Sequence, residues 1–244
     1  MESVLRQTWR DIEYLVVDGG STDGTVEIIR EYDAKFGGRM RWVSERDRGM
    51  YDAINKGIAM ATGEVVGILN ADDVLASDGI VARVAEAFEG TALDALYGDI
   101  RFVADRRGVD LEDVRAEKTV RYYSSRYFRP WLARFGYLPA HPSFYCRKKV
   151  FEQLGGYRAD YRIAADHELM IRFLVREKSA VRYVPEVFVV MRMGGMSTRS
   201  AESTLVLNWE NIRACRMNGI YSDPFLQLGK YLFKIPGMIF KRGY

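Results

Sequence analysis

Short apolar runs alternate with segments of helical spacing along the first hundred residues. The apolar runs have the length and composition of buried strands and lie at 14–17, 40–44, 65–69 and 95–97. The segments of helical spacing lie at 26–36, 50–61 and 77–88, the last one opening on the capping residues Ser77 and Asp78. This alternation predicts an α/β fold with a mainly parallel sheet flanked by helices.

The regular alternation ends near residue 104. Residues 104–118 are charged and are expected to form a surface loop, and residues 119–137 are rich in aromatic and arginine side chains. Helical or extended segments are expected further on, with helices over 148–154, 166–177 and 204–218 and an extended segment over 182–191.

Composition limits the possible classes of protein but does not identify the function. The chain of 244 residues is 48% hydrophobic and 28% charged, which is typical of a globular protein. A net charge of +3 is too small to argue for nucleic-acid binding. Cys146 and Cys215 are expected to be packed thiols, which fits a reducing cytoplasm. No apolar stretch reaches the roughly 18 residues of a transmembrane helix.

Polar clusters follow two of the predicted strands. Asp18-Gly19-Gly20 follows the first, and Asn70-Ala71-Asp72-Asp73 follows the third. Ligands of such sheets bind outside the carboxyl ends of the strands. Adjacent carboxylates repel each other, and Mg²⁺ or Mn²⁺ bound by Asp72 and Asp73 would relieve that repulsion. Taken alone, the 70–73 segment is more typical of a turn before a helix.

Two further segments in the first half carry binding chemistry. The glycines after Asp18 let a ligand approach the backbone, and the Asp18 carboxylate could accept from a base or ribose. The alternative is a capped strand-to-helix turn. Within residues 45–57, Arg48 and the start of a helix could bind an anion. The alternative there is a solvated loop with salt bridges.

Asp166 is the candidate for proton transfer. It lies where a helix should begin, so it either caps that helix or acts as a general base for an attacking hydroxyl. His167 and Glu168 are weaker candidates for the base. His141 could contact a ligand, although a structural histidine is the more frequent case.

In this order, the motifs resemble the family-two glycosyltransferases of the GT-A fold, over about residues 2–195. The matching segments are 17–25, 52–57, 61–64, 69–73, 141–145, 154–157 and 164–169. Residues 44–57 and 141–169 most resemble bacterial polysaccharide-assembly enzymes of the colanic-acid type. Each segment is weak alone, but seven in the right order are specific.

The resemblance implies an inverting, hexosyltransferase-type reaction on a nucleotide-diphosphate sugar, with a UDP-sugar as the expected donor and Mg²⁺ or Mn²⁺ as cofactor. It implies a glycan or lipid-linked acceptor and no nucleic acid. Asp166 would be the base, and Asp73 would bind the metal together with Asp72. The residues implied to contact the nucleotide-sugar are Asp18, Gly19, Asp47, Arg48, Asn55, Asn70 and Asp72.

This chain departs from the family pattern at two places. The metal motif begins with Asn70 where the family usually has Asp. The family also opens with a buried strand carrying a Pro-Thr-Tyr-Asn-like sequence, whereas this chain starts with Met1-Glu2-Ser3-Val4-Leu5. We expect the true start to lie upstream. The alternatives are an inactive chain or a non-catalytic nucleotide-sugar binder.

The resemblance suggests a division of the chain. Residues 1–103 form the nucleotide-sugar-binding half, residues 104–200 form the acceptor-binding half of the same domain, and residues 201–244 form a helical extension. Apolar residues interleaved with lysines over 224–244 are expected to lie on an anionic membrane surface. A helix packed back on the domain is the alternative. The expected location is therefore the cytoplasm, at the inner face of the cell membrane.

Overall fold

The computed structural model describes residues 1–104, 110–193 and 201–229. Strands and helices alternate in the first half, as the apolar pattern predicts. In chain order they are α1 (Glu2–Leu5), β1 (Tyr14–Asp18), α2 (Thr25–Phe36), β2 (Met40–Ser44), α3 (Met50–Met60), β3 (Val65–Gly67), β4 (Val74–Leu75), α4 (Ile80–Phe88) and β5 (Ala95–Val103).

The second half contains more short elements. They are α5 (Leu111–Ala116), β6 (Arg121–Tyr123), η1 (Pro130–Phe135), η2 (His141–Ser143), β7 (Phe144–Arg147), α6 (Lys148–Leu154), α7 (Ala165–Ile171), η3 (Arg172–Arg176), β8 (Val181–Arg192), α8 (Ala201–Met217) and α9 (Pro224–Leu228). The η3 segment is one turn of π-helix that continues α7.

The described strands form two sheets. β1 and β2 pair in parallel, and the other strands form a sheet in the order β3-β7-β5-β8-β4, with β6 paired to β5. β5 and β8 pair in parallel, whereas the β3–β7, β4–β8, β5–β6 and β5–β7 pairs are antiparallel. The α/β fold is as predicted, but the expectation of a mainly parallel sheet is corrected to a mixed one. Buried apolar runs predict strands, but they do not fix strand direction.

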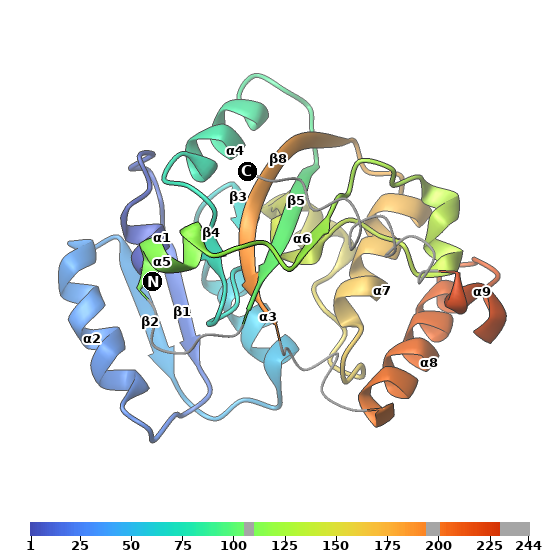
Figure 1. Ribbon diagram of the computed structural model, residues 1–244, viewed down its shortest axis with the longest axis horizontal. Coiled ribbons are helices and arrows are strands. Elements are labelled where there is room, and N and C mark those ends of the chain that lie inside the picture. Colours follow the sequence, from blue (N-terminus) through green and yellow to red (C-terminus); the bar gives the residue numbers. More distant parts are fainter. Residues whose placement is uncertain (105–109, 194–200, 230–244) are drawn as a thin grey trace.

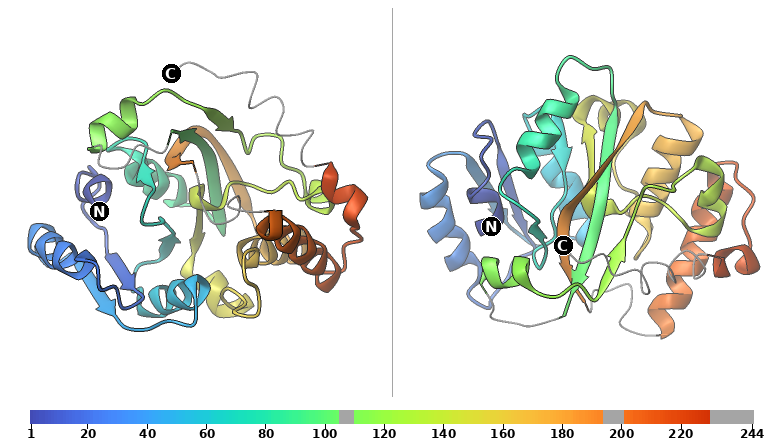
Figure 2. Two further views of the ribbon diagram at one scale, coloured as in Figure 1. Left: turned by 60° about the horizontal axis from the view of Figure 1, so that its bottom comes forward. Right: turned by 45° about the horizontal axis from the view of Figure 1, so that its top comes forward.

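Helices cover the central sheet on both sides. Figures 1 and 2 show α2, β1 and β2 on one side of β5 and β8, and α7, α8 and α9 on the other. One apolar cluster joins α2 and α4 to the sheet through Ile29, Phe36, Ile80 and Phe188. A second cluster joins α3, α6, α7 and α8. The central sheet contains strands from both sides of position 103, and the three-part division of the chain stays a prediction.

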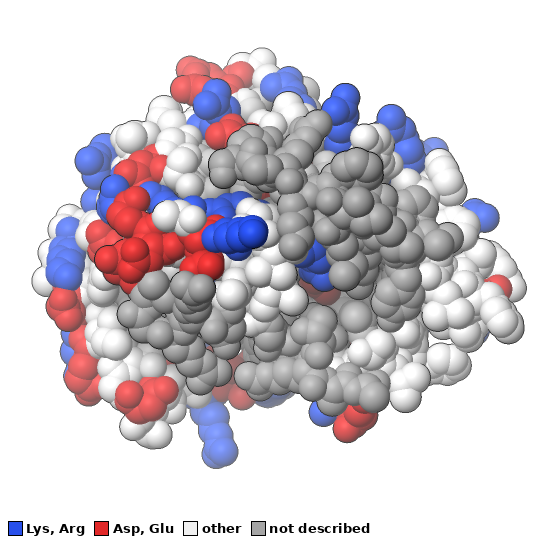
Figure 3. Space-filling model, viewed as in Figure 1, with Lys and Arg blue, Asp and Glu red and all other residues white. Residues whose placement is uncertain are grey.

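Two local expectations are wrong. The charged segment 104–118 contains α5, which Asp110 caps by accepting from the backbone N–H of Asp113 at 2.9 Å. Ser77 and Asp78 do not cap α4, which begins at Ile80. Asp78 instead pairs with Arg115 at 2.6 Å. Acidic and basic side chains gather over the α5 region in Figure 3. A distant cation thus outcompetes the local capping role of Asp78.

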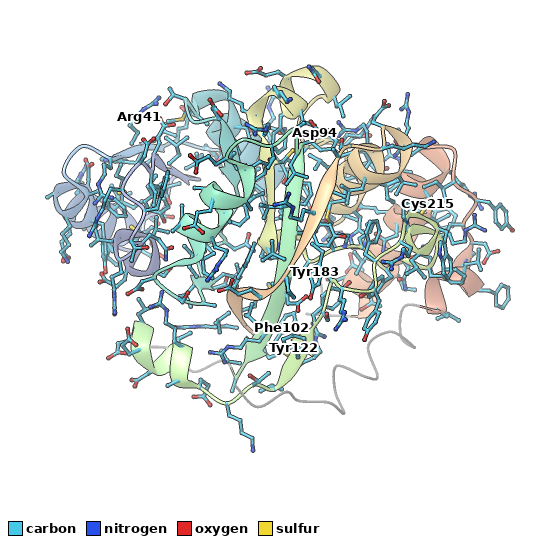
Figure 4. All side chains as sticks on the ribbon, turned by 90° about the horizontal axis from the view of Figure 1, so that it is seen from above. Arg41, Asp94, Phe102, Tyr122, Tyr183 and Cys215 are labelled. Atoms are coloured by element: carbon cyan, nitrogen blue, oxygen red, sulfur yellow. The ribbon has the colours of Figure 1, made fainter. Side chains whose placement is uncertain are left out.

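A buried carboxylate on β5 accepts hydrogen bonds from the neighbouring strands β6 and β8. Asp99 on β5 accepts from the hydroxyls of Tyr122 and Tyr183 and from the backbone N–H of Ser125 at 2.7 Å. Both tyrosines are labelled in Figure 4; Tyr122 lies on β6 and Tyr183 on β8, two of the strands that pair with β5. Cys146 and Cys215 are free and buried, as expected. Within the described residues, no helix is long and apolar enough to cross a membrane.

Candidate active site

The loop after β1 is organised by Asp18. Its carboxylate accepts from the backbone N–H groups of Gly20 (3.1 Å) and Ser21 (2.9 Å) and from the hydroxyls of Ser21 (2.5 Å) and Ser44 (2.6 Å). The hydrogen bonds from Ser21 and Ser44 lower its pKa to about 2. Three of these bonds end on Oδ2 and one on Oδ1, so Oδ1 keeps room for one further donor, such as a group of a base or ribose.

Asp47 keeps an open acceptor beside this loop. One of its carboxylate oxygens pairs with Lys56, which also contacts Glu45 at 2.8 Å. The other oxygen, Oδ2, is buried without a hydrogen-bond partner, and a Cβ atom built on Gly19 would lie 3.5 Å from it. A buried acceptor without a donor is costly. A donor group on a ligand would satisfy Asp47, so the structure brings Asp18, Gly19 and Asp47 together.

Arg48 and Asn55, both expected to contact the nucleotide-sugar, differ in what their side chains contact. The guanidinium of Arg48 is exposed, and its backbone N–H is held by Asp52 at 3.1 Å. Asn55 accepts from the backbone N–H of Tyr157 at 2.8 Å and donates to its carbonyl at 2.7 Å. Both ends of the Asn55 amide thus bind the backbone of Tyr157 in the 155–157 turn. The expected contact of Asn55 with the nucleotide-sugar stays a prediction.

The 70–73 segment places one carboxylate inside the protein and one outside. Asp73 is only 4% exposed, whereas Asp72 is exposed. The Asn70 amide donates to Asp73 Oδ2 at 2.9 Å. The pKa of Asp73 is raised to about 7, mainly by burial; the Asn70 hydrogen bond opposes this rise and the charge of Asp72 adds to it. Through this hydrogen bond Asn70 orients the Asp73 carboxylate, from the position at which the family usually has Asp.

The donor atoms at this segment suit a hard divalent cation. Carboxylate oxygens are ligands that Mg²⁺ and Mn²⁺ prefer, and two carboxylates plus substrate phosphates are a usual ligand set for Mg²⁺. The described residues contain no group of three or more His, Cys, Asp or Glu that could hold a metal by themselves. Any cation bound by Asp72 and Asp73 would therefore take its remaining ligands from substrate or water.

Asp166 lies in the first turn of α7, at the meeting point of several elements. Its Oδ1 accepts from the backbone N–H of His167 at 2.9 Å. The Tyr51 hydroxyl on α3, which donates to the Ile163 carbonyl, lies 3.3 Å from the same oxygen as a second, longer contact. Burial raises the pKa of Asp166, but the hydrogen bond from His167 and the charges of His167 and His141 outweigh it and set the pKa at about 2. Asp166 is therefore an ionised carboxylate. It does not occupy the N-cap position, which belongs to Ala164.

Tyr157 connects His141 to this cluster. The hydroxyl of Tyr157 lies 2.6 Å from His141 Nε2, and its ring stacks on Tyr51 with centroids 5.8 Å apart. Burial lowers the pKa of His141, although Asp166 opposes this change. Sequence reasoning missed Tyr51 and Tyr157 as organisers of the site. The only signal was their presence inside matching motifs, because neither side chain suggests chemistry by itself.

Glu210 on α8 holds the segment that leads into Asp166. Its buried carboxylate accepts from the backbone N–H groups of Arg162 (2.6 Å), Ile163 (2.9 Å) and Ala164 (2.8 Å). These donors precede α7 and would otherwise be unsatisfied. Glu210 is thus a positioning residue for Asp166. It lies 44 residues further along the chain, so no local pattern could have identified it.

We expect Glu210→Gln to lower the free energy of unfolding by about 1–3 kcal/mol, because the amide NH₂ would face backbone donors that now share one carboxylate. Thermal and urea unfolding measure the effect. Glu202→Gln is the matched control, since Glu202 lies on the same helix and forms an exposed ion pair with Arg162. Equal stability of the two variants would contradict the role of Glu210.

A cavity of about 260 Å³ opens beside Asp166 and His167. Its described lining comes from β5, β6, β8, α7, α8 and the 136–142 segment. Neither Asp18, Asp47 nor Asp73 lines it. The candidate residues therefore lie in three places: at the ends of β1 and β2, in the 70–73 segment, and beside the Asp166 cavity.

Comparison with known proteins assigns the family. The family model described as glycosyl transferase family 2 matches residues 1–155. The chain therefore belongs to glycosyl transferase family 2. It is 32% identical over 204 residues to a PGL/p-HBAD biosynthesis glycosyltransferase of Mycobacterium bovis, covering 81% of this chain and 72% of that protein. It is 36% identical over 187 residues to a glycosyltransferase of Mycobacterium tuberculosis, covering 75% and 66%.

Solved structures show the same fold at low identity. Staphylococcus aureus TarS 1-349 in complex with UDP superposes with a TM-score of 0.62 at 17% identity, over 95% of this chain and 63% of that chain. The mannosyltransferase PcManGT of Pyrobaculum calidifontis, in complex with GDP-Man and Mn²⁺, gives 0.62 at 20% identity, over 95% and 64%. This chain thus has the GT-A fold and spans less than two thirds of either structure.

Proposed function

We propose that this chain transfers a sugar from a nucleotide-diphosphate sugar to an acceptor hydroxyl with inversion at the anomeric carbon. The observation that carries the proposal is Asp166, an ionised carboxylate beside a cavity and in contact with the Tyr51 hydroxyl of α3. A hydroxyl in the cavity would have a proton acceptor within reach. The acceptor is a glycan or a lipid-linked glycan of cell-surface polysaccharide assembly; the similar mycobacterial protein is named a PGL/p-HBAD biosynthesis glycosyltransferase.

The donor binds on the β1–β2 side under this proposal. The open Oδ2 of Asp47 accepts a hydrogen bond from the base or ribose, and Gly19 leaves room for that contact. Asp18 shapes the loop through its internal hydrogen bonds. Arg48, whose guanidinium is exposed, contributes positive charge near the nucleotide. TarS and PcManGT bind UDP and GDP-Man respectively, and we propose a UDP-sugar here.

Asp73 and Asp72 would hold Mg²⁺ or Mn²⁺, with Asn70 orienting Asp73. When bound, the cation offsets negative charge that develops on the departing nucleoside diphosphate. Asp72 is exposed and is therefore also open to the ribose.

Asp166 performs the proton step. The acceptor oxygen forms a bond to the anomeric carbon while the bond from that carbon to the diphosphate oxygen breaks. The electron pair leaves with the nucleoside diphosphate, and the hydroxyl proton passes to Asp166 Oδ. Because a single attack occurs from the face opposite the leaving group, the configuration inverts. Tyr51, Tyr157 and Glu210 keep Asp166 in place through the contacts described above.

Nucleotide release from a panel of UDP-, GDP- and dTDP-sugars with Mn²⁺ tests the proposal. We expect release from at least one donor, stimulated by a glycan acceptor, and an anomeric configuration in the product opposite to that of the donor by NMR. Donor binding without turnover would instead identify a nucleotide-sugar binder. Retained configuration would overturn the inverting mechanism.

We also propose that the chain contacts a membrane through the η1–α9 surface, defined by the exposed side chains Arg126, Tyr127, Arg129, Trp131, Phe225 and Leu228. The two parts of this surface are joined, since Gln227 of α9 donates to the Arg134 carbonyl of η1 at 3.1 Å. Phe225 is 83% exposed and Trp131 is 58% exposed. Aromatic and basic side chains together suit the headgroup region of an anionic bilayer. The 230–244 part of the expected membrane segment lies outside the described residues.

We expect the double variant Trp131→Ser, Phe225→Ser to bind anionic vesicles about tenfold more weakly than the wild type, because apolar area that would enter the bilayer is lost. Co-sedimentation with phosphatidylglycerol-containing and purely zwitterionic vesicles measures the binding. Leu205→Ser, at an exposed leucine on α8, is the control. Equal sedimentation of all three proteins would count against the membrane contact.

A further inference from the structure

The Asp166 cavity contains two arginines without acidic partners. Arg121 of β6 and Arg192 at the end of β8 both line it, and both lie beside the last residues of β5, opposite Phe102 and Val103 respectively. The Nε atoms of both arginines are buried and have no hydrogen-bond partner. Among the described residues, neither guanidinium forms an ion pair. Two cations therefore face one cavity, and neither is ion-paired with its one described acid, Asp166.

The rest of the lining completes a site for a polar ligand with an apolar side. Asn211 Oδ1 is also buried without a hydrogen-bond partner, so three of the described cavity residues leave polar atoms unsatisfied. His167 Nδ1 lies 3.7 Å from Asp166 Oδ1. Phe102, Met170, Met191 and Leu207 supply apolar surface on which a sugar ring can pack. Phe102 is labelled in Figure 4, on β5 beside the strand that carries Tyr122. Asp166 is the only acid among the described lining residues.

The chemistry of these groups selects an anion with hydroxyls. A guanidinium matches carboxylate and phosphate geometry with paired N–H donors and keeps its charge when buried. Burial lowers the pKa of Arg121, which stacks over the Phe102 ring at 3.8 Å. An anion would compensate this desolvated charge, while ligand hydroxyls could donate to Asn211 Oδ1. A neutral sugar would leave the arginines unbalanced.

We propose that the acceptor carries an anionic group, a phosphate or a carboxylate, which binds to Arg121 and Arg192 while the reacting hydroxyl faces Asp166. The proposal rests on the proposed function, because it assigns the acceptor to the Asp166 cavity. The volume of about 260 Å³ lies just below the roughly 300–1,000 Å³ of drug-sized sites, so it suits a monosaccharide unit with its charged substituent. The remainder of the acceptor extends outside.

The diphosphate of the donor is the competing ligand for the two arginines. The position of the cavity argues against it. The residues assigned to the donor and the metal, including Asp47 and Asp73, do not line this space. Effects on donor and acceptor kinetics separate the two possibilities.

Matched acceptor pairs test the proposal. The first arm compares glucose 1-phosphate and a prenyl-diphosphate-linked sugar with the free sugar and its dodecyl glycoside. The second arm compares glucuronic acid with glucose. We expect kcat/KM to be at least tenfold higher for the anionic member in one arm, and that arm identifies phosphate or carboxylate as the source. Equal kcat/KM within both arms would overturn the proposal while leaving nucleotide-sugar transfer intact.

Arg121→Met and Arg192→Met test the residues. We expect each to lower kcat/KM for the anionic acceptor by about 10–100-fold, as for a lost charged hydrogen bond, with donor KM within twofold of the wild type. Arg182→Met is the matched control, an exposed arginine on β8. A large rise in donor KM would assign the arginines to the diphosphate and overturn the proposal.

A binding readout keeps this test separate from that of the proposed function. Inorganic phosphate and acetate, titrated into the donor-free protein by NMR, should perturb the wild type and the Arg182→Met control but neither cavity variant. Loss of phosphate or acetate binding in both cavity variants supports the anion site even in a chain that shows no transfer. Undiminished binding of both anions by both variants would contradict it.

Discussion

Asp166→Asn is expected to lower kcat by about 10²–10⁴-fold, the usual contribution of a positioned general base, while donor KM stays within twofold. The amide keeps the shape of the side chain and can still accept from the backbone of His167 and contact Tyr51, as Oδ1 now does. It cannot take up the proton of the acceptor hydroxyl. Initial rates of sugar transfer at saturating donor and acceptor measure the loss.

The pH profile adds a second readout for the same carboxylate. Because the pKa of Asp166 is about 2, it is ionised throughout the range from about pH 5 to 9, and its protonation should produce no acidic limb there. The matched control is Asp113→Asn, at an exposed carboxylate on α5. A loss of less than threefold for Asp166→Asn, or a comparable loss for the control, would remove Asp166 from the proton step.

The first half of the fold was predictable because local patterns determine its elements. The apolar run at 40–44 gives β2 with the expected bounds. In the second half the same holds for the 148–154 helix, which is α6. Strand direction and sheet membership were not predictable in this way. They depend on contacts such as β5 with β8, which join residues about ninety positions apart and have no signature in either segment.

The candidate site shows the same limit. Carboxylates that follow apolar runs could be recognised as candidates, since charged groups at such positions suggest chemistry. Their partners could not. Asn55 resembled a ligand contact, yet its amide binds the backbone of Tyr157 across the fold. The unsatisfied Oδ2 of Asp47 and the unpaired arginines of the Asp166 cavity are visible only once burial and hydrogen bonds are known.

The buried carboxylate of Asp73 has opposite consequences for stability and for activity. Burial raises its pKa from 3.8 to about 7, so the folded state holds a proton that the unfolded state releases. Without a cation, stability therefore falls as the pH rises from about 4 through about 7. We expect Asp73→Asn to remove this fall and to raise the free energy of unfolding of the metal-free protein at pH 7.5 by about 1–3 kcal/mol.

The same Asp73→Asn change is expected to lower transfer by about 10²–10⁴-fold, corresponding to several kcal/mol of charge stabilisation at the leaving diphosphate. It should also abolish any rise in melting temperature that Mn²⁺ plus UDP gives the wild type. Differential scanning calorimetry with and without Mn²⁺ and UDP measures binding apart from turnover, and Asp113→Asn again serves as control. A variant that is less stable than the wild type without metal, and that keeps the Mn²⁺-dependent shift, would show that Asp73 is a structural carboxylate. A buried metal ligand should instead destabilise the metal-free protein more as a charged carboxylate than as a neutral amide.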